Sequence, residues 1–184
     1  MKRIGCLFVL FFCLIGCTQQ DFLGRAMDLR QRLMKNECNF DAEITADHGD
    51  IQHSFSLQCQ AGTDGSVAFS VLAPESIEGV TGNLSKSEGK LTFDDKAVAF
   101  QLLAEGQLSP VSAPWIMMKA LTGGYLSCCA MEDDLFHLSI DDSYESDTMR
   151  LEIWFDENDC ITYAEIYWQG RMLLSMHIEN FTYV

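Results

Sequence analysis

The first residues whose types and spacing predict chemistry are Leu14-Ile15-Gly16-Cys17. They end an uncharged run over residues 4–16, which itself follows the positive pair Lys2-Arg3. A positive start, a short apolar stretch and a small residue before the cut are typical of a bacterial signal peptide. The thiol of Cys17 would take a diacylglycerol, and cleavage before Cys17 would free its amine for further acylation. We therefore expect a lipoprotein that is anchored through Cys17.

The uncharged run is too short to cross a bilayer as a helix, which needs about 20 apolar residues. The alternative is an ordinary signal peptide cut at another small residue, with Cys17 incidental. If Cys17 is lipidated, two or more acyl chains such as palmitate give stable anchoring. We therefore predict a signal peptide over residues 1–16, a lipidated cysteine and short tether over 17–20, and one domain over 21–184. The predicted location is the extracytoplasmic face of the cell membrane.

Two further cysteines, Cys38 and Cys59, are predicted to form a disulfide. Apolar and polar residues alternate on both sides of His48-Gly49, which predicts a hairpin with a two-residue turn. Pairing Asp47 with Asp50 sets the two cysteines opposite each other at a non-hydrogen-bonded site, where Cα atoms are ~4.5 Å apart. That spacing is near the lower end of disulfide reach, and an extracytoplasmic compartment permits the bond. A bulge would spoil this register and leave two reduced core cysteines.

Other chemistry is not predicted. His48 lies in the turn and His53 points to the apolar face, so the two do not form a metal site. The run 156–159 is acidic but lacks the glycine and distal glutamate of a calcium loop, which favours a solvated turn. No nucleophile elbow, Walker loop, HExxH or CxxC occurs. The sequence therefore predicts no enzyme, no cofactor and no metal, and it leaves the pairing of Cys128, Cys129 and Cys160 open.

The elements that hold these residues are a helix and then many strands. Residues 21–36 place Phe22, Ala26, Leu29 and Leu33 on one stripe, which predicts a helix packed on a sheet. A second helix is predicted over residues 115–121, where Met117 and Met118 either pack in the core or face a ligand. About eleven strands are predicted, over residues 38–47, 50–60, 67–71, 77–84, 90–93, 97–103, 125–131, 135–140, 149–155, 160–168 and 172–181.

The predicted fold class is mainly β, with added helices. A sheet of this size has to curl or split to cover its apolar face. We therefore expect a strongly curved antiparallel sheet, or half-barrel, with an N-terminal helix and a second helix at its concave side.

The segment Leu72-Ala73-Pro74-Glu75-Ser76-Ile77-Glu78-Gly79-Val80 resembles the strand–proline–short helix–strand joint of the lipoprotein-carrier fold shared by LolA and LolB. The hairpin at Leu151-Glu152-Ile153-Trp154-Phe155 and the terminal Ile178-Glu179-Asn180-Phe181 are similar to that family as well. The resemblance covers roughly residues 21–184. It implies a half-barrel whose hollow can hold acyl chains or another apolar ligand, and family members also use the fold for protein contacts.

Two functions are left open by the sequence. In the first, a membrane-anchored protein binds a lipid or acyl chain in the hollow, and His53 could hold a polar head group. The candidate lining residues are Phe40, Ile44, His53, Phe55, Leu57, Phe69, Trp115 and Met118. In the second, the chain's own helices fill the hollow and the domain is a scaffold or regulator for an envelope protein. The formal net charge of −15 opposes a nucleic-acid partner.

Overall fold

The computed structural model describes residues 21–47, 49, 52–85, 89–92, 109–143 and 149–184. Ten antiparallel strands form one sheet in the order β5-β4-β3-β2-β1-β10-β9-β8-β7-β6. The sheet is open, because β5 and β6 form its two edges. The strands are β1 (Cys38–Asp47), β2 (Gln52–Ala61), β3 (Val67–Ala73), β4 (Thr81–Leu84), β5 (Gly89–Thr92), β6 (Tyr125–Glu132), β7 (Leu135–Asp141), β8 (Met149–Phe155), β9 (Ile161–Trp168) and β10 (Arg171–Tyr183).

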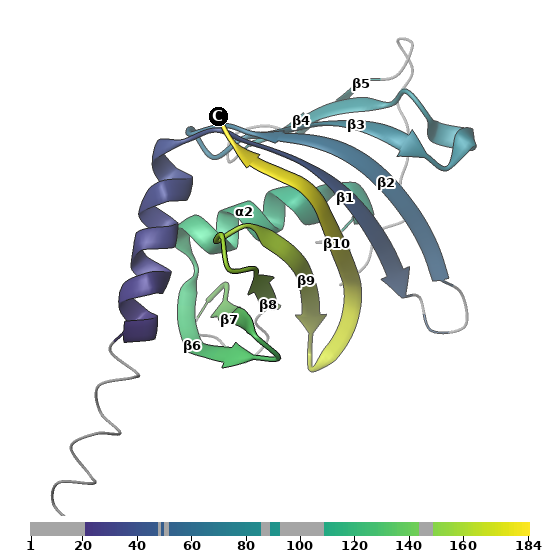
Figure 1. The fold of residues 1–184 in the computed structure, drawn as a ribbon. Coiled ribbons are helices and arrows are strands. Elements are labelled where there is room, and N and C mark those ends of the chain that lie inside the picture. Colours follow the sequence, from purple (N-terminus) through teal and green to yellow (C-terminus); the bar gives the residue numbers. More distant parts are fainter. Residues whose placement is uncertain (1–20, 48, 50–51, 86–88, 93–108, 144–148) are drawn as a thin grey trace, which may run out of the picture.

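Two runs of neighbouring strands build this sheet. The first, β1 to β5, and the second, β6 to β10, each pair every strand with the next one along the chain. Within the described strands, the two runs join where β1 pairs with β10, for example at Ile44 and Met176. Figure 1 shows the resulting curved sheet, with β1 and β10 side by side in its middle.

Helices occupy the concave side and one end of this sheet. The N-terminal helix spans residues 21–35, and α2 (Ala113–Gly123) follows the short 3₁₀ helix η3 (Pro110–Ser112). Figure 1 shows α2 inside the curve of the sheet and the N-terminal helix beside β6. The predicted stripe of the N-terminal helix is confirmed, since Ala26, Leu29 and Leu33 are buried. No helix of the described residues is long and apolar enough to span a membrane.

The joint after β3 has the predicted local form. The Ala73–Pro74 peptide bond is cis, and the 3₁₀ helix η1 (Glu75–Ile77) follows it before β4 begins at Thr81. The predicted count of about eleven strands is not met. The described residues contain ten, and the expected strand over residues 97–103 lies outside them.

The register of the first hairpin differs from the prediction, and the predicted disulfide is therefore wrong. Among the described residues, the pair next to the turn is Asp47 with Gln52 rather than Asp47 with Asp50. Every partner is displaced by two residues, so Cys38 lies opposite Ala61 and Cys59 lies opposite Phe40. Both cysteines are buried and free. A shift of two residues keeps each side chain on its face while changing its partner, because successive side chains alternate between faces.

Candidate functional site

The predicted ligand-lining residues form part of a packed core. Phe40, Ile44, Leu57, Phe69 and Met118 are buried, and Phe55 and Trp115 are partly buried against the same cluster. The core also contains Met117 and Leu121, which α2 presents to the sheet. The concave side of the sheet is thus occupied by the chain's own helix.

Two small cavities border α2. One has a volume of about 160 Å³ and lies between Trp115 and Ile116 of α2 and Met149 and Leu151 of β8. The other has a volume of about 190 Å³ and lies where Leu33 of the N-terminal helix comes close to Met118 of α2. Pockets for small organic ligands typically measure about 300–1,000 Å³. Neither cavity has the size that a bound acyl chain requires.

His53 does not lie in the interior. Its partner across the hairpin is Ala46 rather than Ile44, and its side chain is exposed at the start of β2. The prediction that His53 places a polar group within the hollow is therefore wrong. Its partner Ala46 is buried, but the side chain of His53 itself is exposed.

The cysteines are all free in the described part of the chain, and they differ in surroundings. Burial raises the pKa of the Cys38 thiol to about 11. Burial, with a smaller contribution from the Asp41 carboxylate, also raises the pKa of the Cys59 thiol. Cys128 on the edge strand β6 is exposed. Because the thiolate is the reactive form, the two core cysteines are poor nucleophiles at neutral pH.

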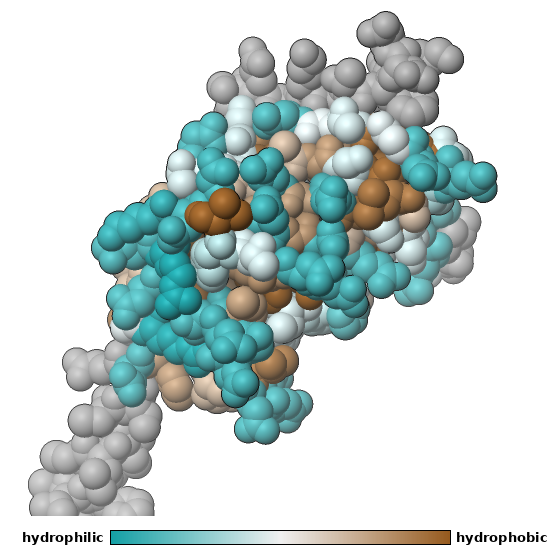
Figure 2. All heavy atoms as spheres, turned by 45° about the horizontal axis from the view of Figure 1, so that its top comes forward, coloured by the Kyte–Doolittle hydropathy of each residue, from teal (hydrophilic) through white to brown (hydrophobic). Residues whose placement is uncertain are grey.

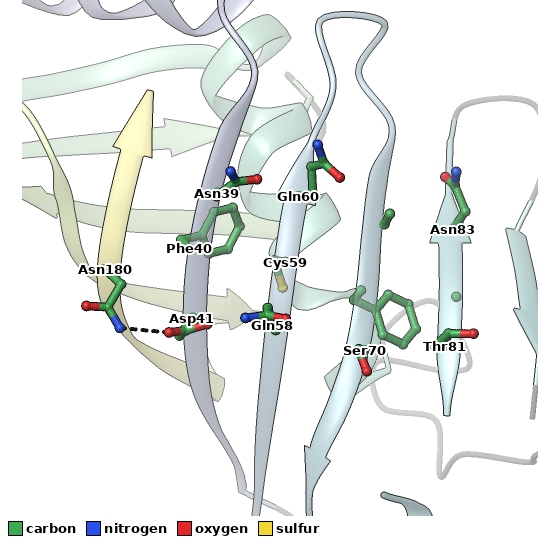
Figure 3. Close-up of a pocket in the computed structure, with 13 residues that line it drawn as sticks. Asn39, Phe40, Asp41, Gln58, Cys59, Gln60, Ser70, Thr81, Asn83 and Asn180 are labelled. Carbon is green, nitrogen blue, oxygen red and sulfur yellow. Dashed lines mark hydrogen bonds between the residues drawn. The ribbon is translucent and has the colours of Figure 1, made fainter. Parts of the chain in front are cut away.

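A groove of about 720 Å³ crosses the opposite, polar face of the sheet, over β10, β1, β2, β3 and β4 (Figure 3). Its rim is rich in carboxamides, and among its lining residues only Asp41 is charged. Asp41 accepts a hydrogen bond from Asn180 Nδ2 at 2.8 Å. The buried residues Phe40, Cys59 and Phe69 also line it. The carboxamides are Asn39, Gln58, Gln60, Asn83 and Asn180.

Sequence reasoning missed this groove. It found alternating apolar and polar residues in both strands of the first hairpin, and a pattern of period two separates only the two faces of a strand. Whether the polar face is hollowed depends on how five strands curve together. The available signal was the group of carboxamides among the polar residues of the second strand of this hairpin, Gln52, Gln58 and Gln60.

No protein-family model matches this sequence, and no curated protein is similar enough to count as a match. The structure is similar to that of an uncharacterized conserved protein from Thermus thermophilus, at TM-score 0.46 and 10% identity, over 88% of this chain and 87% of that chain. It is also similar to a LolA superfamily protein from Nitrosomonas europaea, at TM-score 0.45 and 10% identity, over 85% of this chain and 92% of that chain. An outer membrane lipoprotein-sorting protein domain from Vibrio parahaemolyticus has TM-score 0.43 and 8% identity, over 90% of this chain and 93% of that chain.

These neighbours thus include a member of the LolA superfamily, the family that the sequence resembles. The likeness concerns the course of the chain. It assigns neither a function nor a site residue to this protein.

Proposed function

We propose that this chain is a lipid-anchored extracytoplasmic protein that acts by binding an envelope protein and performs no chemistry of its own. The observation that carries the proposal is the filled concave side, where α2 buries Met117 and Leu121 against the sheet. With the interior occupied, the outer surface is what the domain offers to a partner. An anchor at Cys17 would hold that surface near the membrane, since the N-terminal helix begins at residue 21.

The amide-rich groove is the surface that we assign to this contact. Carboxamides both donate and accept hydrogen bonds, so they match the backbone and polar side chains of a protein segment. The single carboxylate, Asp41, is already held by Asn180. Figure 2, in which the top of Figure 1 is turned forward, shows a mostly hydrophilic face with apolar side chains in small groups. Such a surface suits a polar and reversible protein contact.

Site-specific photo-crosslinking in the producing cell tests this proposal. A photoreactive amino acid placed at Gln60, on the rim of the groove, should give one discrete protein adduct. The same group at Glu75, which is exposed in η1, should not. Substituting Asn83→Ala across the groove should lower the yield from Gln60. Equal yields from both positions, or no effect of Asn83→Ala, would contradict the assignment of the groove.

A second candidate function is binding of a lipid or acyl chain after α2 moves aside. The inward face of the sheet presents Phe40, Ile44, Leu57 and Phe69 to α2, and without the helix these would line one apolar hollow. Met117 and Met118 of α2 suit such an exchange, because methionine adapts to irregular apolar surfaces. Burial of apolar ligand surface at ~25 cal/mol per Å² would drive the exchange.

Native mass spectrometry separates the two candidates. The chain from Thr18 onward is purified without detergent and then offered phospholipid. A filled interior predicts a single mass without adduct and no uptake. A lipid-sized adduct that is lost in Phe55→Glu would instead favour the second candidate, because Phe55 is only partly buried and its replacement should leave the core folded. Circular dichroism of the variant checks that it is folded.

A further inference from the structure

Four aromatic rings form a row on the outer face of the second half of the sheet. They belong to His137 of β7, Trp154 of β8, Tyr163 of β9 and His177 of β10, and each is the direct cross-strand neighbour of the next. Ring centroids lie 4.8 Å apart for His137 and Trp154, 5.4 Å for Trp154 and Tyr163, and 4.8 Å for Tyr163 and His177. The row is continuous across four strands.

Carboxylates lie beside this row, and neutral groups hold them in place. Glu165 accepts hydrogen bonds from the hydroxyls of Tyr163 and Tyr167, at 3.1 Å and 2.7 Å. Glu132 accepts one from the indole nitrogen of Trp154 at 3.0 Å. The bond to Glu165 raises the pKa of Tyr167 to about 12, so this tyrosine stays protonated as a donor. The carboxylate of Glu165 is therefore fixed in position without being neutralised.

In the described part of the chain, no lysine or arginine forms a salt bridge with the glutamates of this row, although Arg150, which is paired with Asp141, also attracts Glu152. Within the described residues, Glu132 and Glu152 form ion pairs only with His137, and Glu165 forms none. Glu152 also lies directly opposite Glu165 on the neighbouring strand. Like charges at opposed positions destabilise a sheet. Packing of the rings explains the aromatic row, but sheet stability does not explain two facing glutamates.

Rings and carboxylates meet around one pocket of about 560 Å³. Its walls include Trp154, Tyr163 and His177 together with Leu135, and three carboxylates border it, those of Glu132, Asp133 and Glu165. Aromatic rings attract cations through their quadrupole, and they do so best where a carboxylate adds its charge. The net charge of −15 also attracts cations to the whole molecule.

We propose that this pocket binds an organic ammonium group, with Glu165 and Glu132 as counter-charges and Trp154 and Tyr163 as the aromatic wall. No cluster of three or more metal-ligating side chains occurs in the described residues, whereas an ammonium group uses both the rings and the acids. The site lies on β6 to β10, away from the amide-rich groove. It goes beyond the proposed function and does not depend on it.

Isothermal titration of the full-length protein in detergent micelles tests this proposal, with choline as the probe. Choline should saturate the site, and its uncharged tert-butyl isostere should bind at least ~tenfold more weakly, because only the charge differs. Nα-acetyl-lysine amide is the second probe. Tighter binding of the lysine probe would indicate a basic protein side chain as the natural ligand, and tighter binding of choline a quaternary amine. Whichever of the two probes binds more tightly, saturable binding supports an ammonium site.

Two glutamate variants sharpen the test. Glu165→Gln should weaken choline binding by ~tenfold while leaving the melting temperature equal or higher, since it removes one member of a like-charged pair. Glu75→Gln makes the same change on an exposed residue of η1 and should leave the affinity unchanged. Equal binding of choline and its isostere would overturn the proposal. Equal choline affinities of Glu165→Gln and Glu75→Gln would overturn it as well. Neither result would bear on the groove.

Discussion

Gly124 joins α2 to β6 at a place where the structure leaves no room for a side chain. A Cβ atom there would lie 2.5 Å from Ile140 Cγ2 and 2.9 Å from the carbonyl oxygen of Ala120. The amide of Gly124 donates to that same carbonyl at 2.7 Å, so the backbone cannot easily shift. The close approach of helix and sheet at this residue helps to hold α2 in the concave side.

We predict that Gly124→Ala lowers the free energy of unfolding by ~1–3 kcal/mol, the usual cost of overpacking a filled site. Gly123→Ala is the matched control. It adds a methyl group where no atom lies within 4 Å, at the last residue of α2, and should be neutral or stabilising. Urea denaturation of both variants measures the difference. Equal stabilities would contradict the close packing of Gly124.

The free cysteines give a second test at the scale of residues. With a neutral-pH alkylating reagent, the exposed Cys128 should react in the native protein. Cys38 and Cys59 should react only after denaturation, because both are buried and the pKa of each thiol is raised. Peptide mapping by mass spectrometry identifies the labelled sites. A Cys38–Cys59 crosslinked peptide under non-reducing conditions would show that the register of the hairpin is that of the original prediction.

The alternating pattern predicted which side chains are buried better than it predicted which residues lie opposite each other on neighbouring strands. The alternating pattern correctly placed Ile44, Leu57 and Phe69 on the inner face. It failed for Cys38 with Cys59, because the register of the hairpin displaces each partner by two residues. A shift of two residues keeps each side chain on the same face of the sheet but changes the residue opposite it.

At the scale of elements, Asp159 attaches the N-terminal helix to the β8–β9 turn. Its carboxylate accepts hydrogen bonds from Arg25 Nε at 2.9 Å and Arg25 Nη2 at 2.7 Å, and Arg32 Nη2 lies 3.2 Å from its other oxygen. The guanidinium of Arg25 also stacks over the Phe136 ring at 4.4 Å. Asp159 itself has φ of 61°, a conformation that aspartate and asparagine tolerate.

We predict that Asp159→Ala costs ~1–2 kcal/mol of stability, a charged hydrogen bond discounted for partial exposure, and speeds amide exchange over residues 21–35. Asp159→Asn keeps the backbone preference and an acceptor, so its effect should be smaller. Glu157→Ala alters an exposed residue of the same turn and serves as the control. Hydrogen–deuterium exchange makes the comparison. Unchanged exchange in Asp159→Ala would mean that apolar packing alone holds the helix.

The sequence predicted this helix but not its attachment. The apolar stripe of Phe22, Ala26, Leu29 and Leu33 signals a helix with one buried face. The acidic turn over residues 156–159 was read as solvated, and nothing local to it indicates that Arg25 lies close by. Attachments between residues so far apart in the chain depend on the three-dimensional path of the strands.

At the scale of the whole molecule, the curved antiparallel sheet with an N-terminal helix and a second helix at its concave side was predictable. The change of period from 3.6 to 2, together with the number of strands, requires a sheet that bends. The pattern left open whether α2 fills the concave side, since the same apolar residues would line an empty hollow. It also treated the outer face as solvent-facing. The row from His137 to His177 arises because four registers align the rings, and no single strand encodes that alignment.

The pairing of β1 with β10 has a consequence for the order in which the chain is made. Ribosomes synthesise residues 171–183 after every other strand of the described sheet, and these residues form the strand that joins its two halves. Until β10 emerges, β1 to β5 and β6 to β9 can form only as separate meanders, each with an open inner edge. The hydrophobic core therefore cannot form completely before β10 has been synthesised. Completion of the sheet therefore depends on a strand that follows both halves in the chain.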